Sequence, residues 1–245
     1  YKTVEEDSGN QTFTTVLLDD GTTDSSGQTI TFEMTTDDPS LFSVGPTLDT
    51  ASGSVNFTPA SDSHGTAILT ITATGSTGTL SSRGLAILLT ITPIADTPTI
   101  SSAGNNLEDI QTTSGLVISR NTGDGDEVTH FKITNISNGT VYKNDGLTAI
   151  LDGEFITYAE GNAGLKFTPD SNLNDSDGTT FGFTAQAATS ASDFGLGGST
   201  VTNTIPVAAV NDDPVITVPS AQTVNEDLGL IFSSAESRLI SISDV

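Results

Sequence analysis

The chain contains no cysteine and no tryptophan, and it has only 7 Lys and Arg residues against 31 Asp and Glu residues. Without cysteine the fold cannot be held by disulfides, and thiol chemistry and cysteine-ligated zinc are excluded. The formal net charge of −24 would repel nucleic acid and anionic membranes, so neither is expected as a partner. Because no apolar run approaches the roughly 20 residues of a membrane-spanning helix, membrane insertion is not expected either.

High net charge with modest hydrophobicity is the usual signature of disorder, but the acidic residues here do not form blocks. They lie between apolar runs with period-two alternation, such as TITFEM (29–34), ILTITAT (68–74) and HFKITNI (130–136). β-Branched and aromatic residues that alternate with Thr or Ser are typical of strands with one buried and one hydrated face. Turn signals such as Asn138-Gly139 separate the runs. The pattern predicts an all-β fold of antiparallel β-sandwiches.

Three landmarks recur along the chain in the same order, which indicates internal repeats. The first is an acidic opener, found as TVEEDSG (3–9), NLEDIQT (106–112) and TVNEDLG (223–229). The second is Phe-Thr-Pro, at 57–59 and 167–169, and the third is a linker with Asp and Pro, ADTP (95–98) or NDDP (211–214). The linker prolines give a repeat period of about 116 residues.

These landmarks predict one β-sandwich repeat over residues 1–97, which lacks its first strand, and a second over 98–213. Residues 214–245 are expected to open a third repeat without completing it, because thirty-odd residues cannot bury a core alone. The chain begins at Tyr1 rather than Met, so we expect a processed or excised sequence. Two interpretations stay open: a complete subunit, or a window onto a longer array.

Acidic residues gather where the predicted repeats meet, and two interpretations compete. In one, they are turn formers and solvated loop acids. In the other, loops converge at the poles of the sandwiches, where Ca²⁺ would take six to eight oxygen ligands and offset the repulsion between carboxylates. The second interpretation predicts Ca²⁺ as cofactor and the following ligands: Glu6, Asp7, Asp19, Asp20, Asp96, Glu108, Asp109, Asp124, Asp126, Asn211, Asp212, Asp213, Glu226, Asp227 and Asp244. Because the first linker supplies only Asp96, weaker or partial occupancy is expected there.

The stretches PVAAVNDDPVITVPSAQTVNED (206–227) and AGLKFTPDSNLNDSDGTTFGFTAQA (163–187) resemble the cadherin-like, immunoglobulin-type tandem repeats of large bacterial surface adhesins. Those repeats show a Val-Asn-Asp-x-Pro linker, an Asn-Glu-Asp opener and a Phe-Thr-Pro strand. The resemblance covers nearly the whole chain. It implies an elongated array of sandwiches, secreted by a Gram-negative bacterium, rigidified by Ca²⁺ between domains and serving in adhesion or as a stalk. The first linker departs from the pattern with ADTP (95–98).

The function expected from these features is an extracellular structural module of a bacterial adhesin or surface fibre. Its partners would be neighbouring repeats or copies of itself. Head-to-tail pairing of strands through 214–245 would propagate into a filament rather than close a ring. The alternative is a ligand-binding module that recognises a carbohydrate or receptor on a host surface or matrix.

An enzyme is not expected from the sequence. His64 and His130 have no cysteine partner and no HExxH motif, and no Gly-x-Ser-x-Gly elbow is present. DSNLNDSDG (170–178) lacks the central Gly and the closing Glu of an EF-hand loop, so a polar hairpin loop is expected there.

Overall fold

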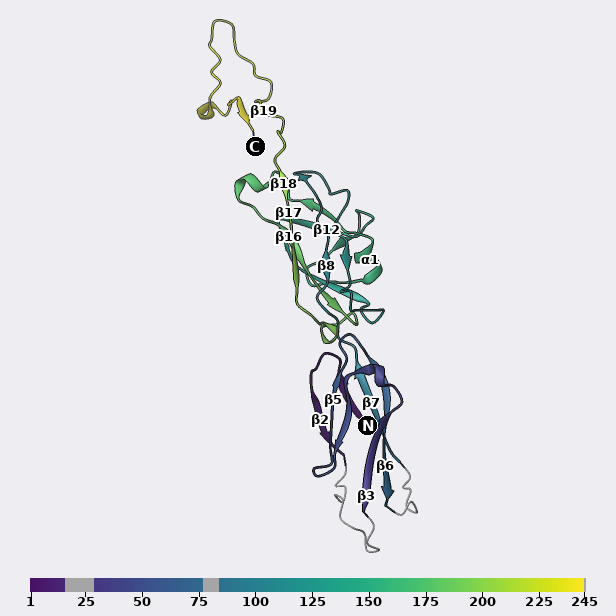
Figure 1. Cartoon of the computed structure of the whole chain (residues 1–245). Coiled ribbons are helices and arrows are strands. Elements are labelled where there is room, and N and C mark those ends of the chain that lie inside the picture. Colours follow the sequence, from purple (N-terminus) through teal and green to yellow (C-terminus); the bar gives the residue numbers. More distant parts are fainter. Residues whose placement is uncertain (16–28, 77–83, 245) are drawn as a thin grey trace.

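The computed structural model describes residues 1–15, 29–76 and 84–244. The chain is elongated, with two β-structured bodies in line and an extended C-terminal segment beyond the second (Figure 1). The first body comprises the elements from β1 to β7, the second body those from β8 to β18, and the C-terminal segment residues 214–244. The prediction of an all-β fold is confirmed, since the described ranges contain one α-helix of five residues. None of the described helices has the length and apolar character needed to cross a membrane.

The first body is a sandwich of two sheets. One sheet has the strand order β1-β7-β6-β3, in which β1 pairs with β7 in parallel, and the other has the order β2-β5-β4. Its elements are β1 (Lys2–Glu5), β2 (Gln11–Thr14), β3 (Ile30–Thr36), the 3₁₀-helix η1 (Pro39–Leu41), β4 (Phe42–Asp49), β5 (Ser54–Pro59), β6 (Gly65–Gly75) and β7 (Leu85–Thr92).

Alternating side chains build the core of the first body. In β5 the buried positions are Val55, Phe57 and Pro59, while the residues between them are partly exposed. Phe57 packs edge-on against the rings of Phe13 and Phe42, with centroids 6.1 Å and 5.6 Å away. Alternation of this kind places every second side chain between the two sheets, so the Phe-Thr-Pro strand lies at the centre of the core.

The second body repeats this plan with more strands. Its main sheets have the orders β14-β11-β16-β17 and β13-β12-β15, and it also has two short pairs, β10-β8 and β18-β9. Its elements are β8 (Thr99–Ile100), β9 (Asn106–Leu107), β10 (Ile118–Ser119), β11 (His130–Ser137), β12 (Gly139–Tyr142), β13 (Ala149–Ile150), β14 (Phe155–Thr157), α1 (Tyr158–Asn162), β15 (Lys166–Pro169), η2 (Asp175–Asp177), β16 (Phe181–Ala188), η3 (Asp193–Gly195), β17 (Val201–Ile205) and β18 (Val207–Ala208).

Phe167 occupies in the second body the place that Phe57 has in the first. It is fully buried and packs edge-on against Phe181, with ring centroids 6.4 Å apart. Ala95 also belongs to this second core and is 0% exposed, although it precedes the second predicted repeat. The repeat boundaries at 97 and 213 remain a prediction.

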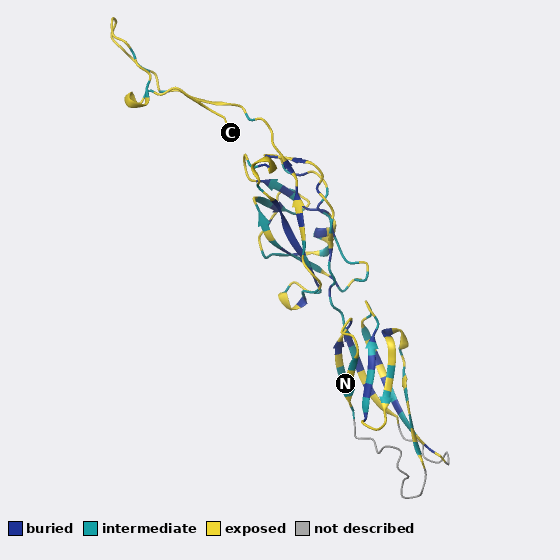
Figure 2. Ribbon diagram, turned by 60° about the vertical axis from the view of Figure 1, so that its left-hand side comes forward, coloured by how far each residue is buried: buried dark blue, intermediate teal, exposed yellow. Residues whose placement is uncertain are grey.

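The C-terminal segment has no core of its own. β19 (Val215–Thr217) pairs with β20 (Ser241–Ser243), and the segment also contains the short 3₁₀-helix η4 (Ser234–Glu236). Most of its residues are exposed, including the apolar Ile216 and Ile242 that face each other in the pair (Figure 2). In the second body Ile100 and Ile118 form the matching pair, and there Ile118 is buried. The same strand pair is therefore present twice, once covered and once uncovered.

Replacing Phe167 by Ala should lower the free energy of unfolding of the second body by about 3–5 kcal/mol, because the change leaves a cavity in a close-packed core. Urea unfolding followed by tyrosine fluorescence measures this, since Tyr142 and Tyr158 both lie in the second body. Phe194→Ala is the matched control, since this side chain is fully exposed and its loss should change stability by no more than about 0.5 kcal/mol. Equal unfolding curves for the two variants would contradict the core assignment.

Candidate metal centre

Each body has a buried glutamate directly after one of its first strands. Glu6 follows β1, is 2% exposed, and accepts a hydrogen bond at Oε1 from the backbone N–H of Ile94 over 2.9 Å. Glu108 follows β9, is 3% exposed, and accepts at Oε1 from the N–H of Val210 over 2.6 Å. Each carboxylate therefore ties the start of its body to the linker that leaves it.

An aspartate in left-handed conformation follows each of these glutamates. The φ angles are +57° for Asp7 and +59° for Asp109, and Asp227 of the third opener has +70°. Aspartate tolerates this region because its short side chain can bond locally to the backbone. The Glu-Asp step thus gives the chain the same left-handed residue in all three acidic openers.

Asp62, in the loop between β5 and β6, completes a group of three carboxylates. Ligand oxygens of Asp7, Asp62 and Asp96 all lie within 4.8 Å of one another. They come from the opener, the loop after Phe-Thr-Pro and the exit linker, three segments far apart in the sequence. We call Asp7, Asp62 and Asp96, together with the adjoining Glu6, the junction cluster.

The second body adds acids to the junction cluster from its β10–β11 loop. Asp124 accepts a hydrogen bond from the N–H of Asp96 over 3.0 Å, and Glu127 Oε2 lies 4.0 Å from Nε2 of His64 in the first body. Asp62 packs so closely against Gly123 that a Cβ atom there would overlap its carboxyl group. Carboxylates of both bodies therefore share one small region.

Burial and mutual repulsion raise the pKa of several carboxyls at this junction. For Asp96 burial is the main cause, followed by the negative charges of Asp124, Asp7 and Asp62. Burial also raises the pKa of Asp124, although the N–H groups of Asp96 and Asn121 act in the opposite direction. These shifts mean that ionised carboxylates are held here against a free-energy cost.

Burial likewise raises the pKa of Glu6, against the lowering effect of its hydrogen bond from Ile94. Its Oε2 is buried without a hydrogen-bond partner among the residues that the structure describes. Nδ1 of His64 is 3.5 Å away, and the two groups form an ion pair only when the imidazole is charged. At the second junction, between the second body and the C-terminal segment, Asn174 takes the place of His64 and donates from Nδ2 to Glu108 Oε2 over 3.2 Å. Glu6 therefore has an unused acceptor where Glu108 has none.

The predicted ligands fall into several groups. Glu6, Asp7, Asp96 and Asp124 are brought together at the first junction. Asp126 is not, because its exposed carboxylate pairs with Nη1 of Arg120 over 2.9 Å. Asp19 and Asp20 lie outside the described residues.

The remaining predicted ligands belong to the second junction or to the C-terminal segment. Burial, and then the charges of Asp109, Glu108, Asp244 and Asp213, raise the pKa of Asp212. Asn211 donates from Nδ2 to the carbonyl of Asp212, so its side chain is engaged within the linker. Glu226 and Asp227 are exposed in the C-terminal segment.

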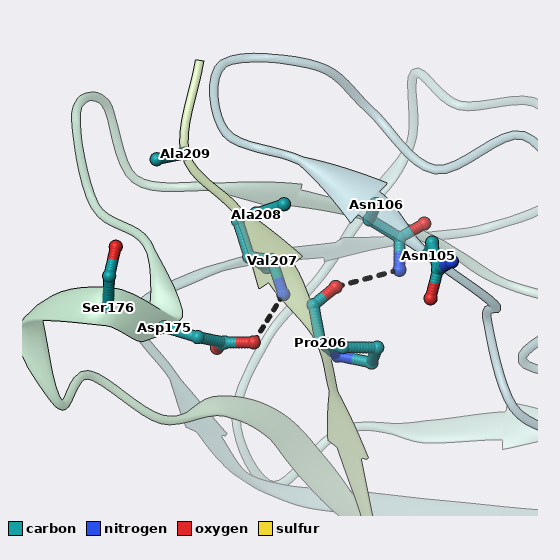
Figure 3. Close-up of a pocket in the computed structure, with 8 residues that line it drawn as sticks. All are labelled: Asn105, Asn106, Asp175, Ser176, Pro206, Val207, Ala208 and Ala209. Carbon is teal, nitrogen blue, oxygen red and sulfur yellow. Dashed lines mark hydrogen bonds between the residues drawn. The ribbon is translucent and has the colours of Figure 1, made fainter. Parts of the chain in front are cut away.

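A hollow of about 360 Å³ lies between β9, β18 and η2 at the far pole of the second body. Figure 3 shows its polar groups engaged with the backbone: Asn106 Nδ2 donates to the carbonyl of Pro206 over 3.1 Å, and Asp175 Oδ2 accepts from the N–H of Val207 over 2.9 Å. Asp175 is therefore used to hold β18, and the rest of the lining is mainly apolar. This hollow does not have the oxygen-rich lining of a cation site.

Asp62 is absent from the sequence-based ligand set, yet its position carried a signal. It follows Phe57 by the same interval that separates Asn172 from Phe167. Both residues adopt left-handed backbone, with φ of +54° and +58°. Aligning the loops after the two Phe-Thr-Pro strands would have pointed to this position.

No protein-family model matches the sequence, and no curated protein matches it. Solved structures do resemble it. The extracellular cadherin domains 1–5 of protocadherin gamma B2 match at 15% identity and a TM-score of 0.44, over 88% of this chain and 39% of that one. Mouse cadherin-23 EC22–24 matches at 15% identity and a TM-score of 0.38, over 78% and 57%. The D00–D0 domain of intimin matches at 13% identity and a TM-score of 0.36, over 84% and 94%.

Lowering the pH from 8 to 5 should stabilise the cation-free chain. The pKa values of Glu6, Asp96 and Asp124 lie above the ordinary 4.5 of Glu and 3.8 of Asp in the folded state. In that pH window the folded state binds protons before the unfolded state does, so the free energy of unfolding rises as the pH falls. Below about pH 4 the unfolded chain is protonated too, and this gain stops.

Urea unfolding in chelator at pH 5 and pH 8 tests this prediction. The variant Glu6→Gln combined with Asp96→Asn and Asp124→Asn should show a smaller pH dependence, because the three perturbed carboxyls are removed. Asp126→Asn is the control, because its exposed carboxylate has only the Arg120 partner. A triple variant with the pH dependence of the control would refute the assignment.

Proposed function

We propose that the chain is a structural repeat module of an extracellular bacterial adhesin or surface fibre, and that Ca²⁺ at the junctions holds its bodies in line. The observation that carries this proposal is the junction cluster. Asp7 and Asp62 of the first body and Asp96 of the linker lie within reach of one cation, and Asp124 of the second body adjoins them. The neighbouring Glu6 has a buried oxygen without a hydrogen-bond partner among the described residues. A cation would convert repulsion across the junction into attraction.

The donor set fits a hard cation. Its atoms are carboxylate oxygens on loops, without a thiol and with His64 as the only nearby imidazole. Ca²⁺ accepts six to eight oxygen ligands in flexible geometry, whereas Mg²⁺ requires a near-ideal octahedron and zinc favours nitrogen and sulfur. Glu6, Asp7, Asp62 and Asp96 would hold the ion, and Asp124 would extend its reach to the second body.

The second junction would hold Ca²⁺ with a related but less charged set. Glu108, Asp109 and Asp212 occupy the places of Glu6, Asp7 and Asp96, while the neutral Asn172 stands where the first junction has Asp62. Glu108 Oε2 is also already engaged by Asn174. We therefore propose tighter binding at the first junction, the reverse of the order expected from the linkers alone.

The arrangement in line supports a role as a spacer or stalk. The two bodies stack end to end, as in repeat proteins whose units contact only their neighbours (Figure 1). The acids lie at the junction rather than in a cleft with substrate-binding side chains. Stiffness, rather than catalysis, is the property that such a placement would give.

The exposed C-terminal segment would be completed by strands from outside it. Ile216 and Ile242 are 61% and 69% exposed, whereas Ile118 in the matching pair of the second body is buried. Apolar strand pairs without a cover are sites for strand addition. We propose that either the continuation of the repeat or a second copy of this chain supplies the cover; addition of a copy would be heterologous and build a filament.

Adding calcium to chain that has been freed of metal with chelator should raise its melting temperature, and calorimetric titration should detect the heat of binding. At a free concentration of 100 times Kd the stabilisation would be about 2.7 kcal/mol for one site. Asp62→Asn should weaken the tighter site by about tenfold or more, because one charged ligand is lost, which corresponds to about 1.4 kcal/mol.

Asp126→Asn is the charge-matched control for calorimetric titration and should leave the affinity unchanged, since Asp126 is engaged with Arg120. Small-angle scattering with calcium and with chelator adds a direct measure of length and stiffness. If neither the melting temperature nor the scattering dimensions respond to calcium, the metal proposal fails.

Deletion of residues 214–245 should leave a chain that stays monomeric at all concentrations in sedimentation velocity. If copies complete one another, the full chain should show association that grows with concentration, because the uncovered strands would pair with a second molecule. A full chain that remains monomeric at high concentration would argue for completion by the continuing repeat instead.

A further inference from the structure

The linker between the bodies is attached far more firmly to the second body than to the first. Ala95 is buried in the second core. Thr97 is held on two sides, because its carbonyl accepts from Asn121 Nδ2 over 3.3 Å and its Oγ1 accepts from the N–H of Ser199 over 2.8 Å. Three segments of the second body thus enclose residues 95–97: its core, the loop around Asn121 and the loop before β17.

Two adjacent glycines let the loop before β17 lie directly on the linker backbone. A Cβ atom on Gly197 would overlap the carbonyl oxygen of Ala95, and one on Gly198 would overlap the nitrogen of Thr97. Gly198 also has a φ of +59°, which disfavours other residues. No side chain fits between these two backbones, so contact at this distance requires glycine at both positions.

This loop is itself anchored to the second body. The N–H of Gly197 donates to the carbonyl of Ala187 over 3.2 Å, and Gln186 Nε2 donates to the carbonyl of Gly198 over 3.1 Å. Both anchors belong to β16, a strand of the main sheet whose residues are mostly buried. The loop is therefore a fixed support for the linker and not a free strap.

Attachment to the first body is different in kind. Beyond the end of β7, the linker donates a hydrogen bond to the first body from the N–H of Ile94 to Glu6 Oε1 over 2.9 Å. Glu6 is buried with one oxygen unpartnered among the described residues, and carboxylate oxygens of Asp7, Asp62 and Asp96 lie within 4.8 Å of one another. Without a cation this side of the linker is destabilised by charge, whereas the contacts of Ala95 and Thr97 with the second body are apolar or neutral.

We infer that residues 95–97 form a clamped part of the second body whether or not a cation is bound, with Gly197 and Gly198 as the positioning residues. The joint of the junction then lies at Pro93–Ile94, where the N–H of Ile94 bonds to Glu6 of the first body while its side chain borders Gly197 of the second. This inference rests on the proposed function only in placing the cation at the same junction, because the clamp itself needs no ion. A bound cation would then need to restrict rotation only at this short joint, and not along the whole linker.

Amide hydrogen exchange of the full chain, measured by NMR in calcium and in chelator, tests the clamp. The N–H of Ser199 reports the contact with Thr97, and the N–H of Ile94 reports the contact with Glu6. Chelation should lower the protection of Ile94 by about tenfold or more and leave that of Ser199 within about twofold. Loss of protection at both amides on chelation would overturn the inference.

Gly198→Ala should lower the protection of Ser199 by about tenfold or more in both conditions, because the loop is pushed off the linker. Gly45→Ala is the matched control, since a Cβ there meets nothing within 4 Å, and it should change neither amide. Thr97→Val, which keeps the shape and removes the acceptor, should also expose Ser199 while tyrosine fluorescence reports a folded second body. Unchanged Ser199 protection in both Gly198→Ala and Thr97→Val would refute the clamp.

The outcomes separate this inference from the calcium proposal. If calcium changes no amide and no melting temperature, the metal proposal fails, yet protection of Ser199 that depends on Gly198 still supports the clamp. If calcium protects Ile94 and Ser199 together, calcium binding is supported and the clamp is refuted.

Discussion

The carboxylate of Glu6 decides how the first body ends. It is buried directly after β1 and accepts a hydrogen bond from the N–H of Ile94, so the segment that leaves the body is fixed relative to the strand that begins it. A buried carboxylate is costly unless its charge is offset, and Glu6 has one oxygen without a partner among the described residues. The neighbouring Asp7 adds negative charge, and His64 offsets it only when the imidazole is charged. At this end of the first body the backbone N–H of Ile94 is hydrogen-bonded, but the negative charge of the carboxylates is not balanced.

The second junction shows the same arrangement with a different balance of charge. Glu108 accepts from Val210 as Glu6 does from Ile94, but Asn174 satisfies its other oxygen. His64 in the first body and Asn174 in the second occupy equivalent positions. This one difference leaves Glu6 with an unpartnered oxygen among the described residues, whereas both oxygens of Glu108 accept hydrogen bonds. Two bodies with similar backbone arrangements can therefore have junctions that differ in how much negative charge is left unbalanced.

Much of the fold could be predicted from the sequence because strand alternation and turn signals are local properties. The period-two runs indicated β-structure, and the Phe-Thr-Pro landmark places Phe57 and Phe167 in the two cores. The membership of the acidic cluster was harder to predict, because it depends on the direction of each side chain. Asp124 and Asp126 are two residues apart, yet one bonds to the linker and the other pairs with Arg120 in solvent.

Asp62 was missed for a related reason. Its approach to Asp7 and Asp96 depends on the left-handed backbone of a loop, and composition does not reveal such a conformation. Ala95 shows the same limit, since a linker residue in a run of turn formers gives no sign that it is buried in the next core. Both positions follow from three-dimensional contacts between segments remote in sequence.

The burial of Ala95 next to the half-buried carboxylate of Asp96 has a consequence for the spacing of the two bodies. Ala95 lies in the second core, while the carboxylate of the next residue, Asp96, lies in the junction cluster. Because the second body holds Ala95 and Thr97, residues inserted before Ala95 would lengthen the joint and leave Ala95 in the core. They would instead move Asp7 and Asp62 away from Asp96, so the number of residues between β7 and Ala95 sets the separation of the carboxylates across the junction.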